Sequence, residues 1–151
     1  MNFRLTTLTL VLSLIFSINI QAESPINWTN YYSDSEVKIE YQYTNCEYKE
    51  FFNQEFVMLK ITNFTNKDFT VKWNNETWYD KKCINCSDKD NAESQNEVFI
   101  QANEIVLGNC NDQNSLKIFS KFSEKIEDMP GVKKIVKLTK FKLKNIYISY
   151  E

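Results

Sequence analysis

The chain has 151 residues, a formal net charge of −2 and 42% hydrophobic residues, which is enough for one domain of ordinary size. It has no histidine, which excludes Ser-His-Asp and Cys-His catalysis and every imidazole metal site within this chain. Its 2 glycines exclude the phosphate-binding loops that need glycine at several fixed positions, and 15% aromatic residues exclude a disordered chain.

The first residues have the pattern of a secretory signal peptide. Arg4 precedes an apolar run over residues 5–18, and a polar exit ends at Ala22. The run has roughly 14 residues, fewer than the ~20 that a membrane-spanning helix needs. We therefore expect a signal peptide over residues 1–22 and a single domain over residues 23–151. The mature chain is expected to have no membrane span and to be secreted or periplasmic.

Apolar residues at alternate positions predict half-buried strands along most of the mature chain. In chain order, the predicted strands cover residues 37–43, 55–62, 69–73, 76–82, 97–101, 105–107, 115–119 and 136–148. Asn74 and Asn75 suggest a bulge or tight turn between the third and fourth of them. In the last stretch the apolar phase changes twice, which indicates a bulge, a hairpin or a strand that passes between sheets.

This pattern predicts an all-β fold, because no segment shows a helical stripe of useful length. Short strands separated by polar turns favour an immunoglobulin-like antiparallel β-sandwich of about seven to nine strands. A small β-barrel is the alternative.

Four cysteines, an even number in an exported chain, predict two disulfides. If successive strands alternate in direction, the four lie in loops at one end of the sandwich. Pairings that join Cys83 and Cys86 to different partners are preferred because they tie separate loops together. A Cys83–Cys86 bridge together with Cys46–Cys110 is also feasible. The cysteines are Cys46, Cys83, Cys86 and Cys110.

Two other readings of the cysteines have less support. A redox site at Cys83 and Cys86 would normally open a helix, and no helical pattern follows. A four-cysteine metal site usually has two C-x-x-C pairs or a histidine, and this chain has one pair and no histidine. We expect no metal, no cofactor and no catalytic residue.

Aromatic side chains could form a sugar-binding platform if their faces are exposed. Trp73 is expected in the core between the sheets. The candidates for ligand-facing aromatics are Trp28, Tyr31, Tyr32 and Trp78.

Lysines also gather towards the end of the sequence, where residues 129–151 hold 6 lysines and one acidic residue. Lys140, Lys142 and Lys144 alternate, so on a continuous strand they share one face. They could form a basic stripe for an anionic polymer or lipid, or a solvated face that prevents edge-to-edge aggregation.

Carboxylate pairs are available for acid–base chemistry of the glycosidase type, although the sequence does not give their separation. They are Glu47/Glu50, Glu124/Glu127/Asp128 and Asp88/Asp90.

The order of these features resembles small exported β-sandwich proteins of Bacteroidetes-type bacteria that have no assigned function. The resemblance starts from the strand Val37–Tyr41 followed by Cys46. It continues through the Val71–Trp73 strand, Trp78-Tyr79 before Cys83-x-x-Cys86, and the closing segment 138–145. It implies an extracytoplasmic location and supplies no activity.

The function that we expect is therefore an exported, non-enzymatic module that binds or scaffolds at the cell envelope or outside the cell. Its partner is unknown, with an envelope protein or a glycan as candidates, and nucleic acid is not expected. The alternative is an extracytoplasmic enzyme for thiol–disulfide exchange or for glycan hydrolysis.

Overall fold

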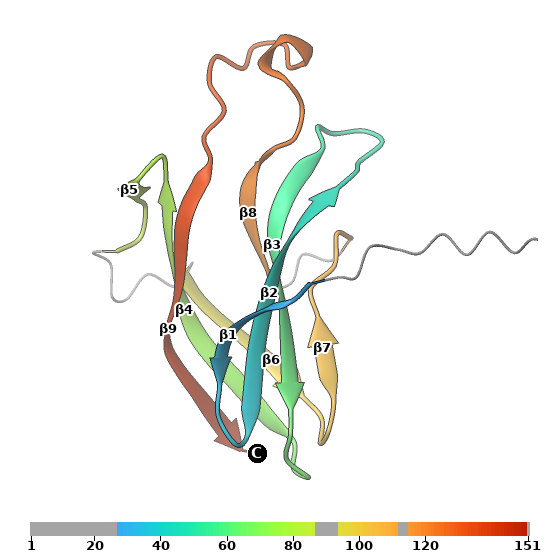
Figure 1. The fold of residues 1–151 in the computed structure, drawn as a ribbon, viewed down its shortest axis with the longest axis vertical. Coiled ribbons are helices and arrows are strands. Elements are labelled where there is room, and N and C mark those ends of the chain that lie inside the picture. Colours follow the sequence, from blue (N-terminus) through green and yellow to red (C-terminus); the bar gives the residue numbers. More distant parts are fainter. Residues whose placement is uncertain (1–26, 87–93, 112–114, 151) are drawn as a thin grey trace, which may run out of the picture.

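The structure of the protein is a computed structural model that describes residues 27–86, 94–111 and 115–150. The expected signal peptide lies outside the described residues, and so do Asp88 and Asp90. The described chain forms two antiparallel sheets that pack face to face (Figure 1).

Sheet A has the order β1-β2-β3, and β7 and β8 both pair with the other edge of β3. Its strands are β1 (Thr29–Ser33), β2 (Val37–Cys46), β3 (Gln54–Asn63), β7 (Ile105–Leu107) and β8 (Lys117–Phe122).

Sheet B is built around β4, which pairs with β9 along one edge and with β5 and β6 along the other. Its strands are β4 (Phe69–Tyr79), β5 (Lys82–Cys83), β6 (Gln95–Ile100) and β9 (Leu138–Tyr150). A short 3₁₀ turn, η2 (Ile126–Asp128), lies in the long connection between β8 and β9.

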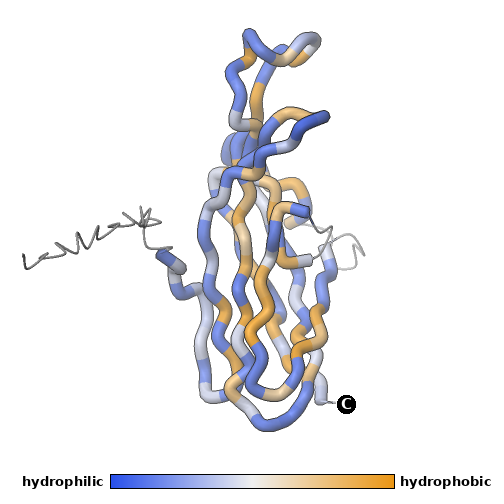
Figure 2. Tube along the Cα trace, turned by 90° about the vertical axis from the view of Figure 1, so that its right-hand side faces the viewer, coloured by the Kyte–Doolittle hydropathy of each residue, from blue (hydrophilic) through white to orange (hydrophobic). Residues whose placement is uncertain are grey.

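The core lies between the two sheets, as the alternation in the sequence predicts. Hydrophobic and hydrophilic residues alternate along the strands (Figure 2). Trp73 is 2% exposed in this core, so the prediction that it packs between the sheets is confirmed. Its indole Nε1 donates to Asn75 Oδ1 at 3.0 Å, which satisfies the buried N–H. The all-β sandwich is therefore confirmed. The main cluster contains Val37, Ile39, Val57, Leu59, Ile61, Phe69, Val71, Trp73, Ile100, Leu116 and Ile118.

The phase changes in the last predicted strand correspond to two register shifts between β9 and β4. One shift lies where β4 passes from Trp78 to Tyr79, and the other where it passes from Lys72 to Asn74. β9 therefore stays in one sheet and contains two bulges, one of the three outcomes that the sequence allowed. The sequence suggested a bulge or a tight turn at Asn74-Asn75: no turn occurs, because β4 is continuous there, but a register shift lies at Lys72/Asn74, with the extra residue in β9.

The cysteines form two disulfides, with Cα–Cα distances of 5.5 Å for Cys46–Cys110 and 5.8 Å for Cys83–Cys86. The preferred pairing, in which Cys83 and Cys86 had different partners, is wrong. After Cys83 the chain stays against β4, where Ile84 N donates to Thr77 O and the Asn85 side chain bonds to Thr77 and Asn75, and in this local turn the two neighbouring cysteines meet.

The two disulfides involve strands of different sheets. Cys46 ends β2 and is buried with Phe56 and Met58, whereas Cys83 pairs in register with Trp78 on sheet B. The four cysteines therefore form two separate bridges, one at the end of β2 and one beside β5. Strand direction places loops at the same end but does not place them on the same sheet.

Candidate functional site: the outer face of sheet B

The three alternating lysines of β9 lie on one face of sheet B, as the sequence predicts. Lys140, Lys142 and Lys144 pair in register with β4 residues that alternate with the buried ones, so they point away from the core. Their partners in β4 are Trp78, Glu76 and Asn74.

These three lysines form no ion pair within the described part of the chain: no carboxylate oxygen there comes within 4.0 Å of their ammonium groups, although Glu76 lies across from Lys142 in β4. Lys140 Nζ lies 4.7 Å from the centroid of a Trp78 ring, and Lys142 Nζ lies 5.8 Å from one. A cation–π contact holds an ammonium group in place but does not neutralise it. The stripe therefore keeps its positive charge, and Trp78 supports two lysines instead of presenting an open platform.

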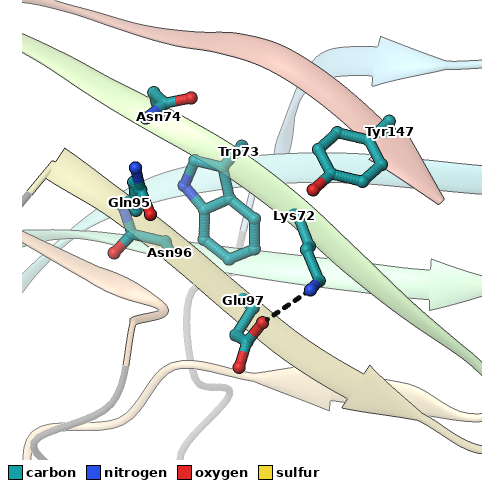
Figure 3. A pocket seen from close by; sticks show the side chains of 7 residues that line it. All are labelled: Lys72, Trp73, Asn74, Gln95, Asn96, Glu97 and Tyr147. Carbon is teal, nitrogen blue, oxygen red and sulfur yellow. Dashed lines mark ion pairs between the residues drawn. The ribbon is translucent and has the colours of Figure 1, made fainter. Parts of the chain in front are cut away.

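A hollow of about 470 Å³ adjoins this stripe on the same face. Figure 3 shows Lys72 of β4 and Glu97 of β6 joined by an ion pair of 3.1 Å, with Tyr147 of β9 beside them. Glu97 raises the pKa of the Lys72 ammonium through a hydrogen bond, so this lysine stays protonated and paired. The hollow is also lined by Asn74, Gln95 and Asn96.

A second hollow, of about 370 Å³, shares Asn74 with the first. It is lined by Glu76 and Ser94, and by Lys144 and Asn145 from β9. Asn145 Nδ2 donates to Asn74 Oδ1 at 3.4 Å, so the two strands are linked by side chains between the hollows.

The bulge at Asn145 makes this arrangement possible. Its φ of 53° lies in the left-handed region, which asparagine tolerates better than most residues. Strict alternation after Lys144 would point Tyr147 into the core. Because the bulge inserts extra residues, Lys144 and Tyr147 both reach the outer face, while Ile146 and Ile148 pack against the core.

The disulfide Cys83–Cys86 encloses Asn85, whose side chain lines the second hollow. Asn85 Oδ1 accepts from Thr77 N at 2.9 Å, and Asn85 Nδ2 donates to Asn75 O at 2.6 Å. The side chain thus takes the place of a strand in the gap between β5 and β6. This gives the C-x-x-C segment a structural role.

The turn between β4 and β5 contacts two further lysines, Lys134 and Lys137, which precede the basic stripe of β9 in the sequence. Asp80 and Lys81 have φ values of 48° and 69°, which suit a two-residue hairpin turn. Lys134 contacts the Asp80 carboxylate at 2.5 Å and lowers its pKa below the ordinary value. Asp80 N also donates to Lys137 O, so the turn and the loop that leads into β9 are held together.

The other predicted ligand-facing aromatics lie apart from Trp78. Tyr31 stacks on Phe141 at 5.6 Å between the edges of the two sheets. Trp28 packs on the outer side of sheet A, with Lys60 Nζ 4.9 Å from its ring centroid. Tyr32 donates to Asp34 Oδ2 at 2.7 Å. The three belong to or adjoin β1, a strand that was not predicted because its residues are mostly polar.

The described acidic residues named for acid–base chemistry lie outside the strands, with Glu47 and Glu50 between β2 and β3, and Glu124, Glu127 and Asp128 between β8 and β9. Glu124 Oε1 accepts from Asn53 N at 2.6 Å and so ties two loops together. Glu50 lines a hollow with Phe51 and Phe52 in the connection between β2 and β3. The described residues contain no group of three or more side chains arranged to hold a metal ion.

Comparison with family models, with curated proteins and with solved structures gives no match for this chain. In the described ranges, no helix has both the length and the apolar character needed to cross a membrane.

The sequence analysis missed the residues that line the two hollows. Lys72, Asn74 and Glu76 occupy the polar phase of the same strand whose apolar phase was recognised. The alternate residues from Thr70 to Trp78 are all outside the core. Their regular spacing is the signal that could have identified one continuous outer face.

Proposed function

We propose that this chain is an exported, non-enzymatic binding module that acts at the cell envelope or outside the cell. Two observations support export: the signal-peptide pattern over residues 1–22, and two disulfides, which persist in an oxidising compartment. The partner binds the outer face of sheet B.

The observation that carries this proposal is the excess of positive charge on β9, where Lys140, Lys142 and Lys144 face one acidic residue, Glu76, among their three register partners in β4. A sheet face that only needs to be soluble can mix charges of both signs, as Lys38, Lys60 and Glu40 do on sheet A. Glu40 lies 2.8 Å from Lys38 and 2.5 Å from Lys60, and these ion pairs lower its pKa although burial alone would raise it. Glu76 lies across from Lys142 in β4, but within the described residues none of the three β9 lysines forms an ion pair within 4.0 Å, so their ammonium groups remain available to an anionic partner.

We also propose that the connectivity is immunoglobulin-like. The chain passes from β3 to β4, from β6 to β7 and from β8 to β9, and each of these connections joins one sheet to the other. Repeated crossing between two antiparallel sheets is typical of Greek-key sandwiches.

The test of the binding function compares two variants of equal charge on immobilised heparin, used as a generic polyanion. Replacing Lys140, Lys142 and Lys144 with Gln should lower the salt concentration at which the protein elutes, since fewer ammonium groups face the polyanion. The control replaces Lys49, Lys67 and Lys125, three exposed lysines outside β9, and should elute later than the first variant. Equal elution of both variants would contradict a binding face on sheet B.

A further inference from the structure

We propose that the outer face of sheet B binds a linear acidic polysaccharide whose carboxylate groups contact the lysines of β9 while its hydroxyl groups enter the two hollows beside them. This inference rests on the proposed binding function and names its ligand class.

The first step is the position of the charges. Lys140, Lys142 and Lys144 are two residues apart along one strand, so their attachment points repeat every ~6.8 Å. Two of them are held over Trp78, which limits their freedom before a ligand arrives. A row of ordered charges along a strand fits an extended chain that carries acidic groups at intervals.

The second step is the chemistry of the hollows. Their shared wall is Asn74, whose side-chain contacts are long: 3.4 Å to Asn145 and 3.5 Å to Ser94. Hydrogen bonds of this length are weak, so a hydroxyl group can replace them at little cost. Gln95 adds an exposed amide that offers both donors and an acceptor. Neighbouring hydroxyl groups of a sugar need this mixture of donors and acceptors.

The third step is the aromatic side chain beside the first hollow. Tyr147 is 55% exposed and lies next to Lys72 in Figure 3. An exposed phenol combines an apolar ring with a polar hydroxyl, which suits a sugar ring that has both kinds of surface. The bulge at Asn145 brings this ring to the same face as Lys144.

These features favour a polysaccharide over an anionic membrane or a polyphosphate. The side chains that line the two hollows are amides, charged groups, a tyrosine, a hydroxyl and the disulfide-bonded Cys86, and Trp73 is buried in the core beneath them. Insertion into a lipid surface requires protruding apolar groups. Ionised polyphosphate offers acceptor oxygens but no donors, so it leaves the carbonyl oxygens of the amides in the hollows unpaired, whereas sugar hydroxyl groups can bond to both ends of each amide.

The experiment measures binding of the purified full-length protein to polygalacturonate, to inorganic polyphosphate and to phosphatidylglycerol vesicles by isothermal titration calorimetry. The hollow variant combines Gln95→Ala with Tyr147→Ala and leaves the charge unchanged. The stripe variant replaces the three lysines of β9 with Gln, and Tyr43→Ala, at a 52% exposed tyrosine of sheet A, is the control.

We expect the stripe variant to weaken binding of both soluble polyanions. The hollow variant should weaken polygalacturonate binding by about fivefold or more, the factor expected for the loss of one hydrogen bond, and leave polyphosphate binding within about twofold. The control should bind as the unmodified protein does.

Two results would overturn the inference and leave the binding function in place. One is a stripe-dependent affinity for polygalacturonate that the hollow variant does not change. The other is stripe-dependent binding of polyphosphate or vesicles without binding of polygalacturonate. If no probe binds, or if the stripe variant binds every probe like the unmodified protein, the binding function on sheet B fails as well.

Discussion

At the scale of single residues, Asn85 shows how one side chain completes a sheet. β5 has two residues, and the gap between it and β6 leaves backbone groups of β4 without a strand partner. The amide of Asn85 bonds to two of them, Thr77 N and Asn75 O. The disulfide between Cys83 and Cys86, which enclose Asn85 in the sequence, keeps it in position. Buried backbone groups need such partners because water does not replace them freely.

Replacing Asn85 with Ala should therefore lower the free energy of unfolding by about 1–3 kcal/mol, since two backbone groups lose their partners. Denaturant unfolding followed by fluorescence measures this effect. The matched control is Ile84→Ser within the same disulfide loop. Ile84 is 63% exposed, and its change should cost less than about 0.5 kcal/mol. Similar unfolding midpoints for both variants would show that the Asn85 bonds contribute nothing.

At the scale of elements, β9 is the strand on which the site depends. Its two bulges set which side chains face outward, and the side chain of Tyr31 from β1 bonds to its backbone. The hydroxyl of Tyr31 accepts from Leu143 N at 2.7 Å and donates to Leu143 O at 3.4 Å. A side chain thus occupies backbone groups that an edge strand would otherwise offer to another chain.

The variant Tyr31→Phe keeps the ring contacts and removes this hydroxyl. We expect a loss of stability of about 1 kcal/mol and faster hydrogen exchange of the Leu143 amide, because its acceptor is gone. Exchange measured by NMR tests this at the one residue concerned. Unchanged protection of Leu143, or an equal effect of Tyr43→Phe at an exposed position, would refute the role of Tyr31 as an edge cover.

At the scale of the whole molecule, the two disulfides contribute differently to stability. Cys46 and Cys110 are separated by 64 residues in the sequence, so their bridge joins distant parts of sheet A. Cys83 and Cys86 are separated by 3 residues, and their bridge restricts only a local turn. A crosslink lowers the entropy of the unfolded chain more strongly when it closes a longer loop.

The double variant Cys46→Ser with Cys110→Ser should lose about 4 kcal/mol of stability on this entropic model. The double variant Cys83→Ser with Cys86→Ser should lose less, and its loss should largely match that of Asn85→Ala. Thermal unfolding of both proteins, with thiol counting to confirm the remaining bridge, makes the comparison. A larger loss for the Cys83/Cys86 variant would contradict this order.

The local pattern of the sequence was sufficient for the fold class and for part of the site. Alternation shows which side of its own strand each residue occupies, because the side-chain period of a strand is fixed at two. For this reason the core position of Trp73, the common face of Lys140, Lys142 and Lys144 and the irregularities of β9 could be predicted.

Tertiary structure alone decided which segments became neighbours. The pairing of Cys46 with Cys110, the place of Tyr31 beside Leu143 and the hollows around Asn74 each join residues that are far apart in the sequence. Alternation does not contain this information, since it specifies a face and not the strand that lies next to it. Those contacts are fixed by the packing of two sheets and by the loops that cross between them.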